Sequence, residues 1–197
     1  NTLIVLTADH GEELFDHGRL GHGYSLYEEL LEVPLVIVGP GVPAGLREPA
    51  LVSTTSVAAT LLRLADLPMP GAAPALLPLP AAAASGPAFA AVRTHLFGPA
   101  LSLISARDGT GRKLILSLDD QGAALSREAF DLRADPREAA PLDPAGRADG
   151  SLWAALQEQA LAWYRDSAAR RPPEPQPPES EAMREAMKHI GYMSAGR

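Results

Sequence analysis

Residues 2–8 form a short, unbroken apolar run, Thr-Leu-Ile-Val-Leu-Thr-Ala, close to the beginning of the chain. A run of this length that is rich in β-branched residues is typical of a strand buried on both faces, as in parallel sheets that helices cover. Residues 33–38 repeat the pattern after a predicted helix over residues 25–32, with Ser25 at the N-cap and Glu28 at the capping-box position. This alternation of strands and helices predicts an α/β fold.

The second half of the chain predicts a smaller antiparallel sheet. Residues 101–106 and 113–118 are strand-like runs on either side of an Asp-Gly-Thr-Gly turn, which is a hairpin signal, and residues 129–132 can add a third strand. A helix over residues 150–169 would cover this sheet with one apolar side. That side consists of Leu152, Leu156, Ala160 and Trp163.

The remaining segments connect these elements or follow them. Residues 54–66 predict a further helix, with Ser53 or Thr54 as its cap, and the Ala/Pro-rich residues 71–87 predict a loop. The Pro-rich residues 171–179 predict an extended linker before a last short helix over 181–189. The sequence therefore divides into three parts: an α/β core segment (1–95), a small antiparallel sheet with a helix (96–170), and a linker with a terminal helix (171–197).

Composition excludes several classes of protein. The net charge of −7, with no basic cluster larger than Arg170-Arg171, gives no electrostatic reason to bind nucleic acid. No apolar run reaches the roughly 20 residues that a transmembrane helix needs, so this portion predicts no membrane span. The absence of cysteine excludes disulfides and thiolate metal ligands within these 197 residues. Because the chain begins at Asn1 and runs at once into a strand, we expect a further part upstream.

The loop after the first strand holds the residues most suited to chemistry. Asp9 and His10 stand where this strand ends, and His10, His17 and His22 are three of the five histidines of the chain. In open α/β sheets ligands bind beyond the carboxyl ends of the strands, and a loop frees neighbouring side chains to point the same way. A carboxylate and an imidazole in this place could hold a divalent cation. The residues alone leave a second interpretation open, in which Asp9 caps a turn and the histidines are solvated.

The segment Leu-Ile-Val-Leu-Thr-Ala-Asp-His-Gly-Glu over residues 3–12 resembles the metal-binding segment of the sulfatase family, within the alkaline phosphatase superfamily. Further segments resemble the same family in the same order. These are residues 21–29, 33–37, 57–68, 130–138 and the Ile-Gly-Tyr of residues 190–192, which is common in one bacterial branch. The resemblance implies the C-terminal part of an alkaline phosphatase/sulfatase-like sandwich, with a small antiparallel C-terminal subdomain.

The resemblance also implies roles for individual residues. Asp9 and His10 would be ligands of one divalent metal ion, and His22 would be a catalytic residue that contacts the transferred sulfate or phosphate. Many arylsulfatases have Asn in place of His10, which suits calcium, whereas an imidazole favours zinc or manganese. The metal is therefore Ca, Mn or Zn. We expect His17 to be a loop histidine or to support a ligand, and Glu12 to be an ordinary loop carboxylate.

Other candidates receive structural interpretations. We expect Tyr24 and Tyr27 to be packing residues, and His95 and His189 to be structural or solvated. The family nucleophile, a modified Cys or a Ser or Thr, has no counterpart here, so we expect it in an N-terminal half of the same parent protein. The chain by itself would then be inactive.

The resemblance predicts a parent enzyme that hydrolyses sulfate or phosphate esters and is periplasmic or extracellular. Two alternatives remain open at this point. One is a transferase of the same superfamily that moves a phospho-group to an acceptor. The other is a degenerate domain that binds without catalysis.

Overall fold

The computed structural model describes residues 2–68, 86–94, 101–145 and 147–170. The predicted linker, the terminal helix, the segment 190–192, His95, His189 and nearly all of the predicted loop over 71–87 lie outside these residues.

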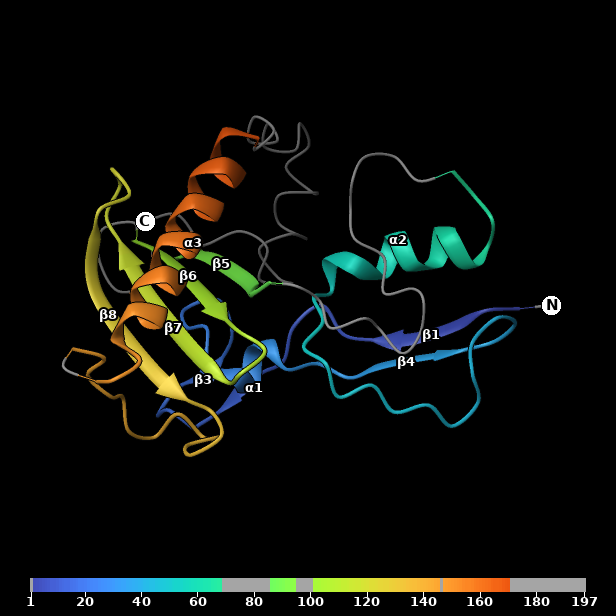
Figure 1. The fold of residues 1–197 in the computed structure, drawn as a ribbon, viewed down its shortest axis with the longest axis horizontal. Coiled ribbons are helices and arrows are strands. Elements are labelled where there is room, and N and C mark those ends of the chain that lie inside the picture. Colours follow the sequence, from blue (N-terminus) through green and yellow to red (C-terminus); the bar gives the residue numbers. More distant parts are fainter. Residues whose placement is uncertain (1, 69–85, 95–100, 146, 171–197) are drawn as a thin grey trace, which may run out of the picture. The chain divides into compact units, whose positions relative to one another are not determined.

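The described residues form a mixed α/β structure, which confirms the predicted fold class (Figure 1). A two-stranded pair, a short hairpin and a four-stranded sheet account for all the described strands. In chain order the elements are β1 (Ile4–Thr7), β2 (Glu13–Leu14), β3 (Leu20–Gly21), α1 (Glu28–Leu31), β4 (Leu35–Val38), α2 (Thr55–Leu64), β5 (Ala88–Thr94), β6 (Leu101–Arg107), β7 (Arg112–Leu118), β8 (Ala124–Asp131) and α3 (Gly150–Ala169).

The apolar runs at 2–8 and 33–38 do form strands, β1 and β4, but they pair antiparallel. Ile4 lies opposite Val38 and Leu6 lies opposite Val36, and these four side chains are between 50% and 62% exposed. The predictions of a parallel arrangement and of burial on both faces were therefore wrong for the described chain. The apolar residues align across the two strands on one face, as antiparallel pairing requires, and at least half of the surface of each of these four residues is exposed.

The helix predicted over residues 25–32 is shorter than expected. Helix α1 begins only at Glu28, with Tyr27 at the N-cap and no side-chain cap. The Ser25 hydroxyl donates instead to the carboxylate of Glu13, which is fully buried, and the Glu28 carboxylate pairs with Lys113. The predicted capping box was wrong because partners distant in sequence take up both side chains.

The four-stranded sheet has the order β5-β6-β7-β8 and is antiparallel throughout. The predicted β6–β7 hairpin is confirmed, and the Asp108 carboxylate closes its turn by accepting the backbone N–H groups of Thr110 and Arg112. Strand β8 is longer than predicted. Strand β5 was not predicted, and because it pairs with β6, the sheet begins inside the range 1–95 that the sequence assigned to the α/β core.

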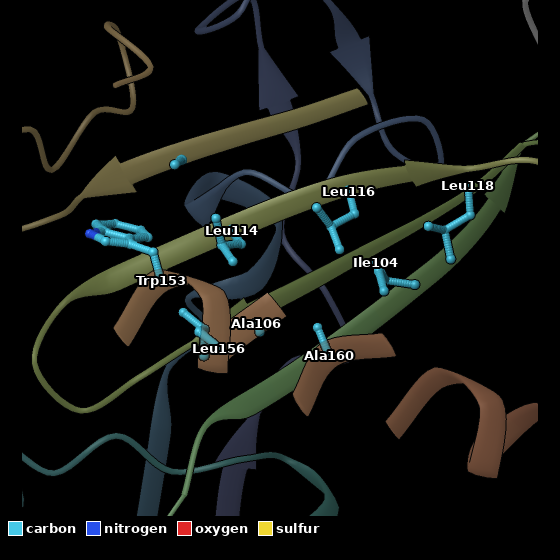
Figure 2. Packing of buried hydrophobic residues seen from close by; sticks show 9 residues of the cluster. Ile104, Ala106, Leu114, Leu116, Leu118, Trp153, Leu156 and Ala160 are labelled. Carbon is cyan, nitrogen blue, oxygen red and sulfur yellow. The ribbon is translucent and has the colours of Figure 1, made fainter. Parts of the chain in front are cut away.

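Helix α3 spans Gly150–Ala169, which confirms the predicted helix, and it covers one face of this sheet (Figure 1). Alternate residues of β7 point toward it, as the period of a strand dictates. Figure 2 shows that Trp153, Leu156 and Ala160 of α3 pack with Ile104 and Ala106 of β6 and with Leu114, Leu116 and Leu118 of β7.

The prediction was wrong for one residue on the apolar side of the helix. Leu152 is 51% exposed, whereas its neighbour Trp153 is buried. The Trp153 indole N–H donates to the Asp149 carboxylate, and this hydrogen bond accounts for the polar atom of the buried ring. Trp163 stacks on Phe89 of β5 with a centroid separation of 5.2 Å.

The opposite face of the sheet carries a buried ion cluster. Lys113 of β7 is fully buried, and its Nζ lies 2.8 Å from a carboxylate oxygen of Glu28 and 2.8 Å from one of Glu138. Arg107 of β6 pairs with the same Glu28. Glu138 also accepts the backbone N–H of Glu28, and burial raises the pKa of Glu138 although Lys113 opposes that effect. This cluster ties α1 to the sheet and to the turn over residues 135–138.

Replacing Lys113 by Met should destabilise the protein by about 3 kcal/mol, because it leaves the Glu138 carboxylate buried without its cation. The double variant Lys113→Met/Glu138→Gln should recover part of that loss. Urea unfolding measures both effects. The control is Arg127→Gln, which breaks the exposed pair with Asp143 at 3.7 Å and an exposed hydrogen bond to Gln157 at 3.4 Å, and it should cost less than about 1 kcal/mol. Equal losses for Lys113→Met and Arg127→Gln would contradict the role of the buried cluster.

Candidate metal centre

A close approach of two backbones holds the loop between β1 and α1. The Gly11 N–H donates to the Leu30 carbonyl at 2.9 Å, and a Cβ at Gly11 would lie 1.9 Å from the Glu29 carbonyl oxygen. Only glycine lets the loop lie this near to α1. The helix therefore fixes the position of the residues on either side of Gly11.

Asp9 and His10 are arranged so that one cation could contact both. His10 Nδ1 lies 2.8 Å from the Gly11 carbonyl, which can only accept, so Nδ1 carries the proton and Nε2 carries a lone pair. That Nε2 lies 3.8 Å from Asp9 Oδ2. Two ligand atoms of one zinc ion can be up to about 4.2 Å apart, since each lies about 2.1 Å from the metal.

The charge of Asp9 also suits a cation. The His10 backbone N–H donates to Asp9 Oδ1 at 3.1 Å, and this hydrogen bond lowers the pKa of Asp9. The carboxylate is ionised at neutral pH and its side chain is 88% exposed, so a metal ion could reach it.

His22 lies beside these residues, together with a carboxylate that the sequence did not single out. The His10 and His22 rings are 4.1 Å apart between centroids, and all three of Asp9, His10 and His22 line one cleft. His22 Nδ1 lies 2.7 Å from Glu12 Oε1. Each of His10, Glu12 and His22 offers one ligand atom, and these atoms lie within 4.8 Å of one another.

The short β2–β3 hairpin explains how Glu12 comes to be there. Glu13 pairs with Gly21, so Glu12 and His22 flank this pair at the open end of the hairpin. Sequence reasoning treated Glu12 as an ordinary loop carboxylate, because strands of two residues have no recognisable periodicity. The spacing of ten residues from Glu12 to His22 contained no other signal.

The donor set fits a borderline metal better than calcium. Asp9 offers a carboxylate oxygen and His10 an imidazole nitrogen, with one more carboxylate and imidazole nearby, whereas calcium takes six to eight oxygen ligands. Nitrogen and oxygen together suit zinc or manganese. The described residues therefore offer both nitrogen and oxygen donors to a divalent cation, from Asp9 and His10 and from the neighbouring Glu12 and His22.

His17 points away from this group and into the protein. Its Nδ1 lies 2.6 Å from Glu29 Oε1 and its Nε2 lies 3.3 Å from the Glu138 carbonyl. The imidazole stacks on Tyr27 at 3.7 Å, and Tyr27 in turn packs edge-on against Phe130. These contacts agree with the expectation of a loop histidine, but the partners of His17 are not the predicted ligands, and they agree with Tyr27 as a packing residue.

Comparison with known proteins shows where this chain has relatives. The sulfatase family model matches residues 1–67. Arylsulfatase K of Rattus norvegicus is 39% identical over 69 residues, which cover 35% of this chain and 12% of that protein. Arylsulfatase K of Homo sapiens is 38% identical over 69 residues, covering 35% and 13%. The low-salt glycan biosynthesis sulfotransferase Agl7 of Haloferax volcanii is 44% identical over 66 residues, covering 32% and 16%.

A solved structure extends the likeness beyond these residues. It comes from a study of the metabolism of multiple glycosaminoglycans by Bacteroides thetaiotaomicron and is labelled 4S-sulf. It is similar to this chain with a TM-score of 0.61 and 17% identity, covering 84% of this chain and 39% of its own. At this identity the likeness shows the fold.

No helix among the described residues is long and apolar enough to cross a membrane. The chain spans only about an eighth of the length of the arylsulfatases that it matches. Residues 1–67 therefore match the sulfatase family, and the fold of the chain resembles that of the solved structure.

Proposed function

We propose that the chain is part of a metal-dependent hydrolase of sulfate or phosphate esters. It would supply two metal ligands, Asp9 and His10, and a catalytic residue that contacts the substrate, His22. The observation that carries the proposal is the grouping of these three side chains on one cleft, in a segment that matches the sulfatase family.

Each residue would have a distinct task. Asp9 and His10 Nε2 would hold the cation, which when bound neutralises the anionic oxygens of the ester. Because His22 Nδ1 lies 2.7 Å from the Glu12 carboxylate, its proton stays on Nδ1 and its Nε2 is left for the substrate. When that Nε2 is protonated, it can donate to an ester oxygen or to the leaving group. Glu12 would thus orient His22.

The nucleophile would come from another part of the parent protein. The chain has no cysteine that could be modified. The exposed apolar face of β1 and β4, formed by Ile4, Leu6, Val36 and Val38, is suited to contact with an N-terminal half of the same parent. We also place the parent in the periplasm or outside the cell, on its resemblance to sulfatases.

A transferase is the second candidate, and one relative favours it. The Haloferax volcanii protein that is 44% identical over 66 residues is named a sulfotransferase. The same metal and histidine could assist transfer to an acceptor hydroxyl as well as to water. Release of free sulfate without an acceptor would support the hydrolase, and dependence on an acceptor would support the transferase.

The variants Asp9→Asn and His10→Ala should each weaken binding of Zn²⁺ or Mn²⁺ by about tenfold or more, because each removes one of the few ligands. Calorimetric titration and elemental analysis of the full-length parent measure this. Asp120→Asn is the matched control, since Asp120 is an exposed carboxylate in the β7–β8 turn. Unchanged metal content in the His10 variant would remove His10 from the site.

His22→Ala in the full-length parent should keep the metal but reduce turnover of an aryl sulfate by roughly 100-fold, the usual scale for one lost acid or charge-stabilising donor. Steady-state kinetics and metal analysis of the same preparation test this. Near-normal turnover would exclude the catalytic role. Loss of the metal together with activity would mean that His22 is a ligand instead.

A further inference from the structure

We propose that His17, in its doubly protonated form, holds the loop between β1 and α1 against α1 and against the turn over residues 135–138. Loss of one proton from His17 releases this loop. His17 is thus a positioning residue that makes the loop sensitive to pH.

The geometry around the imidazole carries this inference. Both ring nitrogens face oxygen atoms that accept: Nδ1 faces the Glu29 carboxylate at 2.6 Å and Nε2 faces the Glu138 carbonyl at 3.3 Å. A neutral imidazole has one N–H, so one of its nitrogens would present a lone pair to an oxygen lone pair. Only the imidazolium form donates to both partners at once.

The carboxylates that act on His17 favour the protonated form. Glu29 comes from α1, Glu138 and Asp135 come from the turn, and the ring of Tyr27 stacks on the imidazole at 3.7 Å. A cation over an aromatic face is attracted to it. Burial lowers the pKa of His17, but the hydrogen bond and charge of Glu29 and the Glu138 carbonyl outweigh it, so the pKa is raised overall.

The turn over residues 135–138 is held in place by contacts that do not involve His17. Glu138 is 2% exposed and has a left-handed backbone, with φ of 53°, while its carboxylate is engaged by Lys113. The Asp135 carboxylate accepts the backbone N–H groups of Ala139 and Ala140. When the proton leaves His17, the loop therefore moves and the turn stays.

The direction of the pH effect follows from the raised pKa. An unfolded histidine titrates near 6.5, and the folded form holds its proton to higher pH. The contacts of His17 are therefore complete below about pH 6.5 and are lost as the pH rises through the folded value. Since the same loop carries Asp9, His10 and His22, metal binding should also depend on pH, and this consequence rests on the proposed function. The contacts of His17 with Glu29 and Glu138 do not rest on it.

Limited trypsin cleavage after Arg19 reports release of the loop directly, because Arg19 is an exposed residue between His17 and His22. The ratio of cleavage at Arg19 to cleavage at the exposed Arg170, in one sample, cancels the pH dependence of trypsin itself. In the wild-type chain this ratio should rise on the order of tenfold between about pH 6 and pH 9, the scale of one charge-assisted hydrogen bond. In His17→Gln it should be high and constant.

Two further variants complete the test. Glu29→Gln should also give a high ratio with little pH dependence, because it removes the carboxylate partner, and it serves if His17→Gln does not fold. Glu32→Gln alters an exposed carboxylate just beyond the same helix and should behave as wild type. A constant ratio in the wild type, or a wild-type pH response in both His17→Gln and Glu29→Gln, overturns the proposal. Zn²⁺ titration of the same samples tests the proposed metal site separately, so either can fail without the other.

Discussion

The described structure depends on the ion pairs that the buried amine of Lys113 forms with two carboxylates. The amine neutralises Glu28 at the start of α1 and Glu138 in the turn that follows β8, two carboxylates 110 residues apart in sequence. Burying three ionised groups is unfavourable unless each has its partner, so the cluster stabilises only one arrangement of helix, turn and sheet. Helix α1 in turn fixes the position of Gly11 and the loop. The position of the candidate site therefore depends on the ion pairs of Lys113.

The two faces of β7 therefore serve different ends. Leu114, Leu116 and Leu118 pack under α3 and form an ordinary apolar core. Lys113 and Ile115 point the other way, toward α1 and the loop. Strand β7 thus has the apolar core under α3 on one side, and on the other side the ion pairs of Lys113 beside a smaller apolar cluster that includes Ile115.

The sequence predicted what local patterns determine. Helix α3 and the β6–β7 hairpin have strong periodic and turn signals, and both were found as expected. The exposure of β1 and β4 was not predicted, because an apolar run shows that a face can be covered but not whether the described residues cover it. Ser25 and Glu28 fit a capping box by spacing, yet Glu13 and Lys113 attract them more strongly.

Some residues of the candidate site could likewise be predicted from local sequence, and others could not. Asp9, His10 and His22 are recognisable from their position after a strand and from family resemblance. Glu12 required knowledge of the hairpin register, and the role of His17 depends on a carbonyl 121 residues away. No pattern within one segment can contain a contact of that range.

The contact between Gly11 and the Glu29 carbonyl has a mechanical consequence. Because no side chain separates the two backbones, the position of Gly11 is tied to α1, whose first residue forms the ion pair with Lys113. The loop and the helix are therefore coupled at Gly11, where the close approach of the two backbones leaves no room for a Cβ.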